Sequence, residues 1–138
     1  MNAYAAGPGA AMADLADRCT AAHGYDPRKP GEISENELAE GERAWRDCMY
    51  AGIDADIAHR SSSPAEWRAL IDADRQMTDA IAAGSMTRSQ RAARLQMLIA
   101  NIRMAELTAA DRRVREAQRN LELQDEIERI RRAVPRFF

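Results

Sequence analysis

The sequence predicts an all-α fold: an N-terminal helical hairpin linked by a disulfide, a third helix, and a long C-terminal helix. Alanine, leucine, isoleucine and methionine supply most of the apolar side chains, whereas valine, which favours strands, occurs only twice. Proline and glycine interrupt helices, and they lie mostly in the first third of the chain. Apolar residues recur every three or four positions, which is the spacing of one helix face.

Length and charge narrow the class of protein. The 138 residues fit one domain. Residues 1–84 have a net charge of −7 and residues 85–138 one of +5, an asymmetry that favours docking between chains or between halves of one chain. Acidic residues alternate with the basic ones in the positive half, so nucleic acid is not predicted as a partner. No apolar run approaches the ~20 residues that span a bilayer, so no membrane span is expected.

The first segment is predicted as a disordered lead-in over residues 1–9, which are small and rich in glycine and proline. A helix follows over residues 10–23, with Cys19 in its apolar seam. Gly24 stands where a left-handed residue closes a helix. Two prolines and a glycine then predict a loop over residues 24–33.

Two further helices complete the predicted region 10–84. Ser34 and Glu37 have the spacing of a capping box, in which each side chain satisfies the other's backbone N–H, so the second helix is predicted to start there. It is expected to end near His59, with Gly52 as a weak point that costs ~1 kcal/mol relative to alanine. Ser63 is the predicted cap of the third helix, in which Pro64 takes the first position and Glu66 completes a second capping box; Gly84 closes this helix.

Residues 85–138 are predicted as a long charged amphipathic helix. Thr87 and Gln90 have capping-box spacing, and no proline or glycine occurs from 88 to 134. One helix of that length would measure ~70 Å. The alternative is a break near Thr108, where a further cap signal appears and the apolar spacing slips.

The apolar seam of this last helix predicts either docking on the chain's own hairpin or pairing with another chain. The spacing resembles a coiled coil with a shifted register. The partner is then either a second copy, in a homodimer paired through 88–134, or another protein. The candidate partner-binding residues are Leu107, Val114, Leu121, Ile127, Ile130, Phe137 and Phe138.

The two cysteines predict the compartment. Cys19 and Cys48 lie on neighbouring predicted helices beside their apolar faces, so we expect a disulfide; two reduced buried cysteines are the alternative. A disulfide implies an oxidising compartment, hence a periplasmic or secreted protein whose signal peptide is absent from this chain. A zinc site built with His23 and His59 is not predicted, since His59 follows Cys48 by about three helical turns.

No motif predicts catalysis, a cofactor or a small-molecule ligand. Asp72 and Asp74, like Asp54 and Asp56, are two positions apart and point in different directions on a helix, so we interpret both pairs as solvated. The sequence therefore predicts a non-enzymatic exported bacterial helical protein that acts by protein–protein interaction. The alternative is a cytoplasmic coiled-coil regulatory or scaffold module with reduced cysteines.

Overall fold

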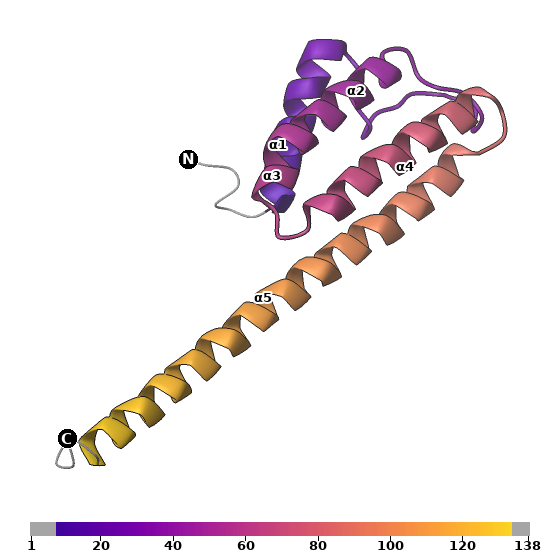
Figure 1. Ribbon diagram of the computed structural model, residues 1–138. Helices are drawn as coiled ribbons and strands as arrows, with labels where there is room; N and C mark the ends of the chain where they lie inside the picture. Colours follow the sequence, from indigo (N-terminus) through magenta and orange to yellow (C-terminus); the bar gives the residue numbers. More distant parts are fainter. Residues whose placement is uncertain (1–7, 134–138) are drawn as a thin grey trace. The chain divides into compact units, whose positions relative to one another are not determined.

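The computed structural model describes residues 8–133, with side chains from residue 10 onward. Residues 8–133 contain no strand, which confirms the all-α class. A π-helical turn, Ile53–Ile57, joins the second helix to the third. Figure 1 labels the five α-helices. The helices are α1 (Pro8–His23), α2 (Glu42–Gly52), α3 (Ala58–Arg60), α4 (Pro64–Ala82) and α5 (Arg88–Ala133).

Contacts divide the chain into two units, residues 1–103 and 104–138. The division falls within α5, whereas the sequence placed its boundary after residue 84. The reason is that Arg91 and Ile102 are buried, so the start of α5 is part of the first unit's core. No residue from 104 to 133 is buried.

The predicted hairpin and its disulfide are confirmed. Cys19 of α1 is bonded to Cys48 of α2, with their Cα atoms 5.8 Å apart, and Cys19 is fully buried. Leu15 lies against Gly52. From the Leu15–Gly52 contact to the Cys19–Cys48 bond, the position moves forward by four residues along α1 and back by four along α2. The two helices are therefore antiparallel. A Cβ atom on Gly52 would lie 2.3 Å from Leu15 Cδ1, so the supposed weak point is a close-packing position between the helices.

The predicted start of the second helix is wrong. Ser34 and Glu37 form a turn, in which the Glu37 N–H donates to the Ser34 carbonyl at 3.1 Å, and α2 begins only at Glu42. The same segment is bound elsewhere: the Arg88 N–H donates to the Glu35 carbonyl at 2.7 Å. A hydrogen bond to a distant part of the chain has outweighed the local cap signal.

The other predicted helix boundaries agree better with the structure. The Thr87 N–H donates to Gln90 Oε1 at 2.9 Å and the Gln90 N–H to Thr87 Oγ1 at 3.0 Å, which confirms that capping box. The helix that begins at Pro64 is also confirmed, although Ser63 makes no side-chain cap hydrogen bond. Because α5 runs unbroken through Thr108, the predicted alternative of a break there is wrong.

The core of the first unit gathers residues from every helix. Trp45 donates its indole N–H to Thr20 Oγ1 at 3.2 Å and meets the ring of Tyr25 edge-on, with ring centres 5.3 Å apart. Side chains of α5 close one side of this core. Its buried apolar members are Ala11, Leu15, Cys19, Tyr25, Trp45, Met49, Tyr50, Ile53, Ile57, Ala58, Trp67, Leu70, Ile71 and Ile102.

Removal of the disulfide should destabilise the first unit. The bridge spans 29 residues of sequence, and closing such a loop restricts the unfolded chain. We expect the double variant Cys19→Ala/Cys48→Ala to lose about 3–4 kcal/mol of unfolding free energy in urea titrations. A loss below about 1 kcal/mol would show that the chain-entropy argument fails here.

Gly41 should be less tolerant of substitution than Gly31. Both have a φ near the left-handed region, 75° and 77°. A Cβ atom on Gly41 would lie 2.6 Å from the His23 carbonyl oxygen, whereas a Cβ on Gly31 meets nothing within 4 Å. Gly31→Ala therefore measures the conformational cost alone, about 1–2 kcal/mol. We expect Gly41→Ala to lose a further ~1–3 kcal/mol of unfolding free energy in the same titration, and equal losses would contradict the clash.

Candidate functional site

The first candidate feature is a buried charged cluster centred on Glu42, the first residue of α2. Its carboxylate is fully buried. It accepts hydrogen bonds from the guanidinium groups of Arg46 (3.0 Å), Arg88 (2.5 Å) and Arg91 (2.6 Å). The backbone N–H of Ala39 donates a fourth bond at 3.0 Å. One carboxylate thus joins α2, the loop before it and the start of α5.

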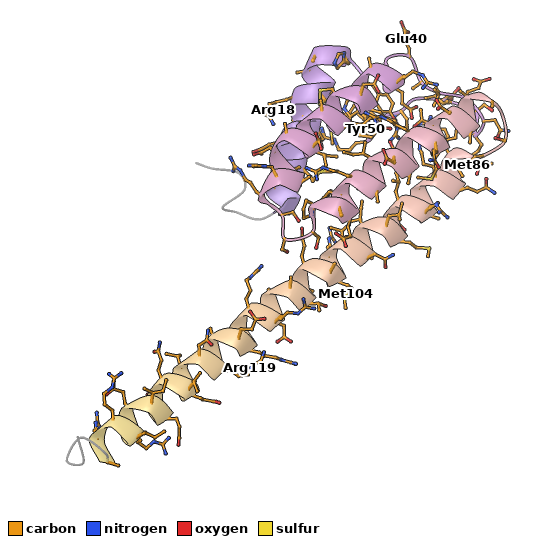
Figure 2. The ribbon with its side chains drawn as sticks, in the orientation of Figure 1. Arg18, Glu40, Tyr50, Met86, Met104 and Arg119 are labelled. Atoms are coloured by element: carbon orange, nitrogen blue, oxygen red, sulfur yellow. A yellow bond between two sulfur atoms is a disulfide. The ribbon has the colours of Figure 1, made fainter. Side chains whose placement is uncertain are left out.

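Asp74 of α4 completes the buried charged cluster. Arg46 donates its Nη1 to Asp74 Oδ2 at 2.8 Å, so this guanidinium connects α2 with α4. The hydroxyl of Tyr50, a residue labelled in Figure 2, donates to the same Asp74 oxygen. Burial, together with the nearby carboxylate, raises the pKa of Tyr50 well above its usual range. We use the name buried charged cluster for Glu42, Arg46, Asp74, Arg88 and Arg91.

The buried charged cluster determines the charge state of Glu42. Burial on its own raises the pKa of a carboxyl group because it disfavours the ion. The backbone hydrogen bond from Ala39 and the three guanidiniums outweigh this and hold the pKa of Glu42 at about 2. Glu42 is therefore an ion at neutral pH, with all its partners in place.

The sequence did not reveal this cluster, and its interpretation of Asp74 was wrong. Asp74 is buried, whereas Asp72 is exposed as predicted. A signal was present, because Asp74 lies three positions after Ile71 and three before Met77, in the apolar stripe of α4. A charged residue at such a position indicates a buried partner of opposite charge.

The loop before α2 is held against the first turn of α5. The Glu35 carboxylate accepts bonds from the Ser89 hydroxyl (2.6 Å) and the Ser89 backbone N–H (3.0 Å). Arg88 donates to the Tyr25 hydroxyl oxygen at 3.1 Å and to the Glu37 carbonyl at 3.0 Å. Hydrogen bonds from the loop thus fix the start of α5 in the first unit.

The second candidate feature is the exposed apolar surface of residues 104–133, whose side chains Figure 2 draws. Between residues 107 and 130, six large apolar side chains are 43–64% exposed, and they include five of the predicted partner-binding residues. Phe137 and Phe138 lie outside the described residues. The six are Leu107, Val114, Leu121, Leu123, Ile127 and Ile130.

These side chains form two stripes on different faces of the helix. Successive residues of an α-helix are rotated by about 100°. On the continuous helix, positions 107, 110, 114, 117 and 121 fall within an arc of about 80°, which we call the first stripe. Positions 123, 127 and 130 fall within about 60°, the second stripe, and its centre lies about 150° around the helix from that of the first. The register shift in the sequence therefore places the two stripes on nearly opposite faces.

Residues 8–133 contain neither a membrane-spanning helix nor a cluster of metal-ligating side chains. No helix in this range combines the length and low polarity needed to cross a membrane. No group of three or more metal-ligating side chains gathers there. Cys19 and Cys48 are joined in the disulfide, so neither is a free thiolate.

Acid should destabilise the protein through Glu42. Its pKa is about 2 in the folded state against 4.5 ordinarily, so its contribution is complete above about pH 4.5 and is lost as the pH falls towards 2. That loss is up to about 3 kcal/mol. In urea titrations from pH 2 to 6, Glu42→Gln should lack this dependence and be less stable at pH 7 by about 3–5 kcal/mol, because buried guanidiniums lose their counter-ion.

Glu40→Gln is the matched control, since Glu40 is exposed just before α2. It should reproduce the wild-type pH dependence. The role assigned to Glu42 is wrong if Glu42→Gln retains the wild-type loss of stability between pH 4.5 and 2.

Comparison of the chain with family models, with curated proteins and with solved structures finds no match in any of the three. Its function must therefore be inferred from its own residues. The buried charged cluster and the two exposed apolar stripes are the features from which that inference starts.

Proposed function

We propose that this protein is non-enzymatic, is exported, and acts by binding protein chains through residues 104–133. The exposure of the six large apolar side chains of the two stripes carries this proposal. Full burial of a valine, leucine or isoleucine side chain stabilises by about 1.5–3 kcal/mol. Six of them supply on the order of 10 kcal/mol, enough to offset much of the entropy lost on association.

The charges of residues 104–133 favour a second copy of the chain as the partner. Residues 112–119 contain four arginines and one glutamate, whereas residues 122–128 contain four acidic residues and no basic one. An antiparallel alignment centred between residues 120 and 121 places each of these segments opposite the other in the second copy. The same alignment brings Val114 of the first stripe level with Ile127 of the second stripe. A single alignment thus pairs basic segments with acidic ones and apolar residues with apolar residues.

The opposite orientation of the stripes determines the size of this assembly. A chain that covers its first stripe with one copy still exposes its second stripe on the far face. A further copy is needed to cover it, so the contact is heterologous and the assembly contains at least three chains. The segment is also shorter than the predicted 88–134, because Arg91 and Ile102 are already buried in the first unit.

Export is proposed because of the disulfide. Such bonds persist in oxidising compartments, which supports a periplasmic or secreted location. The cytoplasmic alternative, a regulatory or scaffold module, requires reduced cysteines. Two free thiols in protein denatured without reductant from its native host would contradict export.

Self-association should be weakened by polar residues in either stripe. We expect sedimentation velocity of the full chain to show species of three or more copies as concentration rises. Val114→Gln and Ile127→Gln should each weaken association at least tenfold, a loss of about 1.4 kcal/mol. Thr108→Gln introduces the same side chain at an exposed position outside both stripes and should leave association unchanged.

A charge exchange tests the antiparallel alignment itself. Arg113 lies about 40° beyond the edge of the first stripe and Glu126 about 40° beyond the edge of the second, so each flanks a stripe. Arg113→Glu should weaken association several-fold, and adding Glu126→Arg should restore it. A wild-type chain that stays monomeric at its highest soluble concentration would exclude a second copy and leave a different protein as the partner. A dimer indifferent to Ile127→Gln would exclude the assembly of three or more.

A further inference from the structure

A cavity of about 370 Å³ lies in the first unit beside the buried charged cluster. Arg46, Arg88 and Arg91 all line it, and Ile33 and Leu95 are its apolar lining residues. A second cavity of about 140 Å³ also reaches Arg46 and Leu95, and its other walls are mostly apolar side chains of α1, α2, α4 and α5. Cationic groups and an apolar recess therefore adjoin one another.

The buried charged cluster contains three positive and two negative side chains, so one positive charge has no counter-charge within the cluster. Its three arginines face two carboxylates, and arginine does not lose its proton in proteins. Arg91 is only 4% exposed, and its Nη1 has no hydrogen-bond partner among the described residues. Burial and the neighbouring Arg46 lower the pKa of Arg91, as expected for a cation with too few counter-charges. An unmatched donor of this kind is costly unless an acceptor reaches it.

We propose that this cavity binds a small organic monocarboxylate, with the carboxylate at the arginines and the apolar part toward Leu95. A carboxylate matches the fork of donors on a guanidinium and supplies the one negative charge that the cluster lacks. Tyr25 also lines the cavity. Its hydroxyl oxygen accepts a hydrogen bond from Arg88, so the hydroxyl proton can be donated to the ligand.

The rim of the cavity selects against more highly charged anions. Glu35 lines it with an exposed carboxylate. This negative charge repels a phosphate group, which carries about −1.5 to −2 at neutral pH, more strongly than a single carboxylate. The apolar walls add affinity for a hydrocarbon part, which inorganic phosphate lacks.

Hexanoate is the probe that tests the ligand class. In an NMR titration of the full chain, hexanoate should shift the Nε–Hε signal of Arg91 and the backbone amides of Ser89 and Ala92. Acetate should bind more weakly because it lacks the tail, and hexanol should not shift the arginine signal because it lacks the charge. The proposal is overturned if hexanoate leaves the Arg91 signal in place, if hexanol shifts it equally, or if inorganic phosphate binds more tightly than hexanoate.

Two neighbouring substitutions locate the site without altering the buried charged cluster. Ala92 lines the cavity, whereas Ala93 does not line it, and both are exposed on α5. Ala92→Glu should weaken hexanoate binding at least tenfold, because it adds a negative charge and bulk at the rim. Ala93→Glu adds the same charge and should change the affinity less than about twofold. Equal losses in the two variants would place the ligand elsewhere and refute the site.

Discussion

A carboxylate that is fully removed from water remains ionised only when fixed donors replace its hydration, and Glu42 meets that condition through four hydrogen bonds. The donors come from α2 itself, from the loop before it and from the start of α5. Ion pairs of this kind are weak evidence for net stability, because desolvation offsets much of their attraction. Their effect is on arrangement: any other placement of α5 would leave a buried charge without its partner. We therefore interpret Glu42 as the residue that specifies how α5 begins.

Local signals in the sequence predicted structure wherever neighbouring residues satisfy one another. The capping box of Thr87 and Gln90 is such a case, because both of its hydrogen bonds join residues three apart. The box predicted at Ser34 failed because Glu35 binds the distant residues Arg88 and Ser89 instead. The disulfide was predictable since two seams with one cysteine each suggested adjacent helices. The buried charged cluster was not, because its members are up to 49 residues apart in sequence.

The two stripes were visible in the sequence only as a change of register. Whether that change matters depends on the helix between residues 121 and 123. A break would let each stripe turn independently, whereas an unbroken helix places them on nearly opposite faces. The break that the sequence left open lies near Thr108, at the start of the first stripe, and neither proline nor glycine occurs between the two stripes. The structure shows that α5 is one continuous helix, so the two stripes lie on nearly opposite faces of it.

The anchored start of α5 also explains how a helix with no buried residue between 104 and 133 is maintained. Helix nucleation is unfavourable, and pairs such as Arg115 with Asp111 add only a few tenths of a kcal/mol each. Because Arg88 and Arg91 hold the first turns in the core, the rest of α5 extends a nucleus that already exists, so only propagation is required. A preformed helix loses less conformational entropy on binding than a segment that folds on its partner. The buried charged cluster of the first unit thereby supports the binding proposed for residues 104–133, although none of the cluster's residues belongs to that segment.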